Sequence, residues 1–104
     1  MDVFTALADP TRREIIALLA AGERNAGDIA GRFDMAGPSV SRHLRVLRES
    51  GVVSFRQRAQ ERIYRLEGPA LAAVREWMDA QLALLHARFD ALGEHLDAMK
   101  ARGD

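Results

Sequence analysis

The sequence contains no cysteine, which excludes disulfide bonds, thiolate-bound metal ions and cysteine redox switches. It has no apolar run near the ~20 residues that a membrane-spanning helix needs, and Met1 to Phe4 lack the character of a signal peptide. We therefore expect a cytoplasmic protein with no membrane partner. Its 104 residues, 48% of them hydrophobic, suit one folded domain.

Net charge is absent too, because 15 Lys and Arg balance 15 Asp and Glu. Domains that bind nucleic acid are often basic overall, so this balance alone argues against such a role. The charge is unevenly distributed, however: residues 37–65 hold seven arginines and only two acidic residues, and both flanking segments are net acidic. A basic concentration of this kind is the footprint of phosphate contact, although a solvated basic surface would look similar.

Helix signals divide the first third of the chain. Val3 to Leu7 shows helical spacing and predicts a short opening helix. Asp9 is an N-cap residue followed by proline, which predicts a helix from Pro10 to Ala21. Asn25 is a cap for the next helix, which we expect to end near Phe33.

Pro38 fits the first turn of a further helix, which Gly51 closes. Val40, Leu44 and Leu47 form its apolar stripe. The opposite face and its flanks are polar and basic, and comprise Ser39, Ser41, Arg42, His43 and Arg45. Such a face suits a groove of phosphates and base-edge acceptors, although periodicity alone fits an ordinary surface helix equally well.

Two short segments rich in β-branched and aromatic residues follow, Val52 to Phe55 and Ile63 to Leu66. They predict a β-hairpin whose basic tip is Arg56 to Arg62. The tip has no Asn-Gly or Gly-Gly pair, so its length and turn type stay open.

The rest of the chain, from Pro69 to about Lys100, predicts one long helix that contains a single glycine, Gly93. A helix of about thirty residues spans roughly 45 Å, which exceeds what a compact domain of this size can cover. Part of its apolar face therefore needs another chain, with packing inside the monomer as the alternative. The apolar residues alternate steps of three and four, as in helix pairing: Leu82, Leu85, Phe89, Leu92, Leu96 and Met99.

This order of elements is that of a winged helix-turn-helix domain. Four strings resemble the ArsR/SmtB family of prokaryotic transcriptional repressors: Leu7-Ala8-Asp9-Pro10-Thr11-Arg12-Arg13, Ser39-Val40-Ser41-Arg42-His43-Leu44, Leu47-Arg48-Glu49-Ser50-Gly51-Val52-Val53 and Tyr64-Arg65-Leu66. The likeness covers nearly the whole chain.

The resemblance implies a mainly α-helical fold with a small β-hairpin, in one domain of residues 1–104, with residues 69–100 as the dimerisation helix. It implies a homodimeric repressor that binds a near-palindromic operator in double-stranded DNA. The helix Pro38 to Ser50 would enter the major groove, and the hairpin would lie near phosphate or the minor groove; the family's wing-tip glycine is replaced by Ala59 and Gln60. The implied DNA contacts are Pro38, Ser39, Ser41, Arg42, His43, Arg45, Arg56, Arg58 and Arg62. The implied dimer interface comprises Val3, Phe4, Leu82, Leu85, Phe89, Leu92 and Leu96.

The family is known for metal-released repressors, and here the chain departs from it. The cysteine pair of its arsenic and cadmium sensors is missing, and His86, Asp90 and His95 do not have the spacing of its other site. We expect no metal or other cofactor, with these three residues as the remaining metal candidates. An effector is possible, but the sequence does not identify one.

Two other classes of function remain. A winged fold can serve as a protein-interaction or antirepressor module without DNA, which the zero net charge favours and the Ser and Arg face disfavours. An enzyme is not expected, because there is no phosphate-binding glycine loop and no clustered carboxylate pair. Ser39 and Ser41 beside His43 lie on a helix surface, where hydrogen bonding to DNA or capping explains them better than catalysis.

Overall fold

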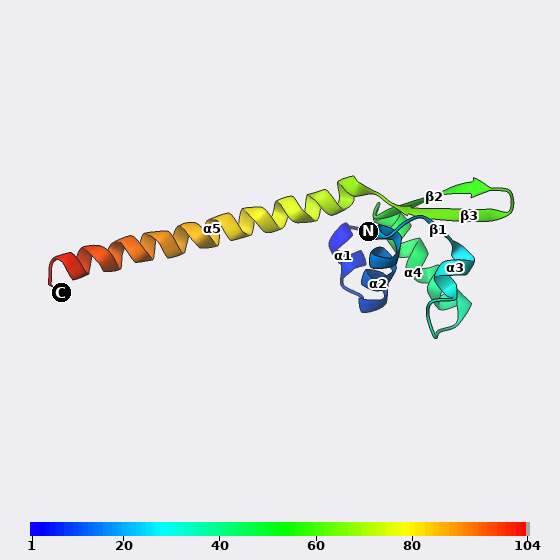
Figure 1. Ribbon diagram of the computed structural model, residues 1–104, viewed down its shortest axis with the longest axis horizontal. Coiled ribbons are helices and arrows are strands. Elements are labelled where there is room, and N and C mark those ends of the chain that lie inside the picture. Colours follow the sequence, from blue (N-terminus) through cyan, green and yellow to red (C-terminus); the bar gives the residue numbers. More distant parts are fainter. Residues whose placement is uncertain (104) are drawn as a thin grey trace. The chain divides into compact units, whose positions relative to one another are not determined.

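The computed structural model describes residues 1–103, which form five helices and three strands (Figure 1). The chain divides into two compact units, an N-terminal unit, Met1–Ala72, and a C-terminal unit, Ala73–Asp104. In chain order the elements are α1 (Val3–Leu7), α2 (Pro10–Ala20), β1 (Arg24–Asn25), α3 (Ala26–Ala30), α4 (Gly37–Glu49), β2 (Val53–Arg58), β3 (Glu61–Leu66) and α5 (Gly68–Ala101).

The core of the N-terminal unit draws on nearly every one of its elements. The apolar stripe predicted for α4 is buried, and α1, α2, α3 and the sheet pack around it. Burial of these side chains removes their apolar surface from water, the main force that holds such a small domain together. The core cluster consists of Ala6, Ile15, Leu19, Ile29, Val40, Leu44, Leu47, Val52, Val53 and Tyr64.

Side-chain caps begin α2 and α3, as the sequence predicts. The Asp9 carboxylate accepts a hydrogen bond of 3.0 Å from the backbone N–H of Arg12, and the Asn25 side chain accepts one of 2.7 Å from that of Asp28. Each supplies a partner to an N–H group that the helix leaves unpaired. Helix α3 ends at Ala30, short of the expected Phe33, and the next residues continue in turns of the i to i+3 kind.

Gly51 sets the path from α4 into the sheet. The backbone N–H of Val52 donates to the Leu47 carbonyl, and that of Gly51 donates to the Arg48 carbonyl. These two bonds form a Schellman motif, which requires a left-handed residue after the cap, and Gly51 has φ of +80°. Leu47 and Val52 are both buried, so the turn connects α4 to β2 through the core.

The three strands form an antiparallel sheet in the order β1-β3-β2. The strands of the hairpin extend further toward its tip than the sequence predicts, because β2 continues past Phe55 to Arg58 and β3 begins at Glu61 instead of Ile63. Its turn is therefore only Ala59 and Gln60, and Ala59 has φ of +56°. Strand β1 was not predicted. The ribbon shows the tip of the hairpin extending past β1 (Figure 1).

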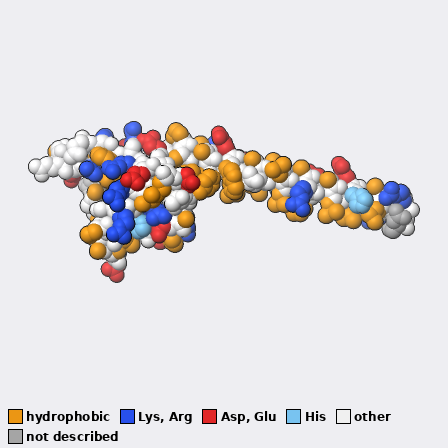
Figure 2. Space-filling model, turned by 180° about the vertical axis from the view of Figure 1, so that it is seen from behind, with side chains coloured by type: hydrophobic (Ala, Val, Ile, Leu, Met, Phe, Trp, Pro, Cys, Tyr) orange, Lys and Arg blue, Asp and Glu red, His pale blue; other side chains and the backbone are white. Residues whose placement is uncertain are grey.

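In the C-terminal unit α5 continues through Gly93 without a break. Within Gly68–Ala101 no residue is buried, and hydrophobic side chains recur along the visible face of this unit (Figure 2). No helix within residues 1–103 is both long and apolar enough to span a bilayer. The large hydrophobic residues exposed on α5 are Trp77, Met78, Leu82, Leu84, Leu85, Phe89, Leu92 and Leu96.

Candidate nucleic-acid interface

Helix α4 presents a polar face because its apolar face is fixed in the core. Val40, Leu44 and Leu47 are at most 4% exposed, so α4 cannot rotate about its axis without exposing them. Residues on the opposite side are therefore held toward solvent. The structure leaves Pro38, Ser41, Arg42 and Arg45 exposed and Ser39 half-buried. In the space-filling view, Lys and Arg side chains gather on the side of the N-terminal unit where α4 lies (Figure 2).

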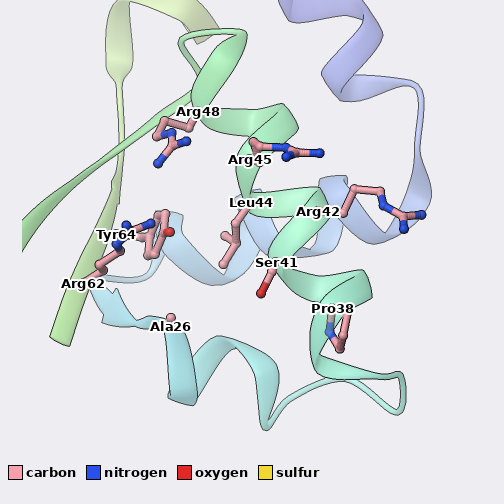
Figure 3. A pocket seen from close by; sticks show the side chains of 9 residues that line it. All are labelled: Ala26, Pro38, Ser41, Arg42, Leu44, Arg45, Arg48, Arg62 and Tyr64. Atoms are coloured by element: carbon pink, nitrogen blue, oxygen red, sulfur yellow. The ribbon is translucent and has the colours of Figure 1, made fainter. Parts of the chain in front are cut away.

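A groove of about 500 Å³ runs between α4, β3 and the first residue of α3 (Figure 3). We call it the basic groove, because four of its lining residues are arginines and none is acidic. Predicted DNA contacts from both α4 and the hairpin meet here. The lining residues are Ala26, Pro38, Ser41, Arg42, Leu44, Arg45, Arg48, Arg62 and Tyr64.

The arginines of the basic groove leave their elements in different directions. Arg42 and Arg45 extend from α4 away from β3, whereas Arg48 extends toward the sheet, on the side where Arg62 and Tyr64 lie (Figure 3). Ser41 points toward α3. Sequence reasoning did not assign Arg48 to the interface. It belongs to the basic segment, but it lies at the edge of the polar face, where helical spacing does not distinguish a contact from a surface residue.

His43 is turned inward. Its side chain is 19% exposed; its Nδ1 lies 3.3 Å from Nη1 of Arg12 and 3.9 Å from the Asp9 carboxylate. Arg12 also donates hydrogen bonds to the carbonyls of Ala6 and Thr5. The backbone N–H of Arg12 lowers the pKa of Asp9, with smaller contributions from the charges of His43 and Arg12. This network joins α1 and α2 to α4, so His43 is placed to hold α4 in position.

The hairpin arginines differ in how their charges are balanced. Nη2 of Arg56 lies 3.3 Å from a carboxylate oxygen of Glu23, and Arg65 is paired with Glu67. Arg58 lies across the hairpin from Glu61 and is exposed. Among residues 1–103, no ion pair is found for Arg42, Arg45, Arg48, Arg58 or Arg62. Five arginines without an ion pair among residues 1–103 therefore lie on α4 and the hairpin.

The residues predicted for a dimer interface fall in both units. Val3 is half-buried in the N-terminal unit, and Phe4 is 45% exposed. The remaining ones, Leu82, Leu85, Phe89, Leu92 and Leu96, are all exposed on α5. His86, Asp90 and His95 also lie on α5, and no group of three or more potential metal ligands is found within residues 1–103.

These features define a class of protein. A helix, α3, is followed by a second helix, α4, whose outer face is polar and basic, and then by a hairpin with a basic strand. This is the winged helix-turn-helix arrangement, in which the second helix is the recognition helix and the hairpin is the wing.

The chain belongs to the ArsR family. The family model described as "Bacterial regulatory protein, arsR family" matches residues 9–54, which run from the cap of α2 into the wing. Transcriptional repressor SdpR of Bacillus subtilis is 42% identical over 77 residues, covering 74% of this chain and 86% of that relative.

Solved structures agree with this assignment. A crystal structure of an ArsR family transcriptional regulator has a TM-score of 0.76 and 35% identity, covering 80% of this chain and 91% of that one. A homodimeric winged helix-turn-helix DNA-binding domain from Mycobacterium bovis has a TM-score of 0.63 and 32% identity, covering 77% of this chain and 78% of that one.

The predictions of fold class and family are therefore confirmed. The protein is a transcriptional regulator with a winged helix-turn-helix DNA-binding fold, from a family of regulators and not of enzymes.

Proposed function

We propose that the protein represses transcription as a homodimer bound to a near-palindromic operator. In this proposal α4 enters the major groove, Ser39, Ser41, Arg42 and Arg45 contact bases or phosphates, and the wing arginines contact phosphates. Residues 69–100 serve as the dimerisation helix of a single winged helix-turn-helix domain, and Val3 and Phe4 contribute to the same interface.

The observation that carries the proposal is the outer face of α4. Arg42 and Arg45 are exposed and without an ion pair among residues 1–103, on a helix whose other face is locked in the core. Two exposed cationic side chains on one helix face attract the phosphates of a nucleic acid. The names of the B. subtilis repressor and of the M. bovis homodimeric domain support repression and pairing.

The test is fluorescence anisotropy with an operator selected from random duplexes by repeated binding and amplification. We expect selection to return a near-palindrome whose half-sites lie about one helical turn, ~34 Å, apart. Arg42→Ala should weaken operator binding roughly 10-fold or more, since a base or phosphate contact contributes ~1–3 kcal/mol. Affinity should also fall steeply as salt rises, because bound phosphates release counterions.

Arg75→Ala is the matched control, because Arg75 is also exposed but lies on α5 outside the proposed interface. Its operator affinity should equal that of the wild type. Selection of an asymmetric single half-site would contradict the homodimer. Failure to select any sequence, together with capture of a stable protein partner, would favour the protein-interaction module.

A further inference from the structure

One aromatic ring in the wing lies against two arginines from different elements. The Cζ atom of Arg48, on α4, lies 5.4 Å from the centroid of the Phe55 ring, and that of Arg62, on β3, lies 4.5 Å from it. Both distances are within the range of a cation–π interaction. Phe55 itself is half-buried, and its centroid lies 5.5 Å from that of Tyr64 in the core. The ring thus gives both flexible side chains a fixed surface.

Neither of these two arginines has its charge balanced by a carboxylate among residues 1–103. Arg65, on the same strand as Arg62, is by contrast paired with Glu67. Both guanidinium groups are cationic and both line the basic groove, which no acidic residue lines. An anion that accepts hydrogen bonds from both would balance their charges.

We propose that Arg48 and Arg62 together bind one backbone phosphate of the DNA, and that Phe55 positions both guanidinium groups. The proposal rests on the proposed function, and it adds a contact that joins the recognition helix to the wing. Guanidinium groups bind phosphate oxygens through paired, charge-assisted hydrogen bonds. A DNA phosphate fits better than a free anion, because Ser41 and Arg45 of the proposed reading face line the same groove.

The experiment replaces each operator phosphate in turn by an uncharged methylphosphonate and measures affinity. For the wild type we expect an affinity loss at several positions in each half-site. Arg48→Ala and Arg62→Ala should each lose part of the sensitivity at one of these positions, the same position for both, and the double variant should lose it entirely. For the double variant the slope of log affinity against log salt should fall by about 0.9 for each lost phosphate contact, hence by about 1.8 for a dimer.

Phe55→Leu tests the positioning role, because it keeps both charges and removes the aromatic face. We expect partial loss of sensitivity at the shared position, whereas Arg48→Lys should retain charge but not the planar fork and should fall between wild type and Arg48→Ala. Thermal unfolding checks that each variant is folded, and Arg48→Lys keeps the proposal testable if Phe55→Leu unfolds.

Arg65→Ala is the matched control, because Arg65 lies on the same strand but is paired with Glu67. It should leave the shared position fully sensitive. If Arg48→Ala and Arg62→Ala lose sensitivity at different phosphates, or at none, the proposal is wrong while the proposed function stands. If the wild type binds no DNA, the proposed function fails, and this contact fails with it.

Discussion

The two units of the chain differ in whether their apolar side chains are buried. The N-terminal unit packs most of its large apolar residues into or against one cluster that α1, α2, α3, α4 and the sheet share. Residues 73–101 of the C-terminal unit form a continuous helix in which no residue is buried, although hydrophobic residues recur along it. In proteins most of the stability of a helix comes from packing of its apolar face rather than from helix propensity. The first unit therefore has a core of its own, whereas the helix of the second leaves its apolar face exposed in the single chain.

The same contrast extends to charge. The N-terminal unit exposes arginines that lack ion pairs, concentrated on α4 and the wing. The C-terminal unit exposes the apolar row that the sequence predicts for helix pairing, which we call the seam and in which Leu85 and Leu92 are one heptad apart. Its exposed members are Leu82, Leu85, Phe89, Leu92 and Leu96. An exposed basic face suits an anionic polymer, and an exposed apolar seam suits a second copy of the helix. In the proposed function the N-terminal unit thus binds DNA, and the C-terminal unit pairs the two protomers.

The largest effect is expected when a charge is placed in the seam, which tests whether this helix pairs with a second copy. Leu85→Asp should convert the dimer to a monomer, because pairing would then bury a carboxylate in an apolar interface. Operator affinity should fall by at least roughly 100-fold, since linking two half-site contacts raises affinity by about 10²–10⁴. Sedimentation equilibrium measures the oligomeric state, and anisotropy measures the affinity.

Leu84→Asp is the control for that variant. Leu84 is 65% exposed and adjacent in sequence, but it lies about 100° around the helix from Leu85 and outside the seam. It should remain dimeric. Equal dissociation of both variants would show that pairing does not follow the predicted seam.

A second prediction makes the same truncation in each unit. Leu47→Ala removes a fully buried side chain and should lower the free energy of unfolding by about 2–5 kcal/mol. Leu92→Ala truncates an exposed residue, so any loss of stability should come through the dimer and change with protein concentration. Urea unfolding at two concentrations about 100-fold apart separates the two cases. A loss independent of concentration for Leu92→Ala would mean that the helix packs within its own monomer.

Features that depend on local chemistry were predictable. The caps Asp9 and Asn25, the core stripe of α4 and the continuous α5 follow from side-chain type and helical spacing, and the structure has all of them. Strand β1 was missed because Arg24 and Asn25 show no strand pattern of their own. They become a strand only by pairing with Tyr64 and Ile63 of β3, far along the chain.

The exposed polar face of α4 was predictable, but the arrangement of side chains where several elements meet was not. The polar face of one helix can be derived from its period, and Ser41, Arg42 and Arg45 are exposed as that period predicts. The arrangement of Arg48 and Arg62 on Phe55 brings together α4, β3 and β2, and no spacing rule relates positions across those elements. His43 lies on the flank predicted for it, yet its contacts with Arg12 and Asp9 place it partly inside the protein.

The smallest expected effect concerns the wing tip, and it tests whether the N-terminal unit can be stabilised without any change in pairing. Ala59 has φ of +56°, a left-handed conformation that costs an L-residue ~1–2 kcal/mol and costs glycine almost nothing. Glycine loses ~0.5–1 kcal/mol more backbone entropy on folding, which offsets part of that gain. Ala59→Gly should therefore raise the free energy of unfolding by about 0.5–1 kcal/mol, measured by urea unfolding of the full chain.

Gln60→Gly is the matched control, because Gln60 occupies the same two-residue turn but does not have a positive φ. It should destabilise, since the added entropy cost meets no relief of strain. Neither variant should alter sedimentation, because the tip is remote in sequence from the seam and carries no part of it. A loss of stability in Ala59→Gly equal to that in Gln60→Gly would mean that the turn does not hold position 59 in the left-handed region in solution.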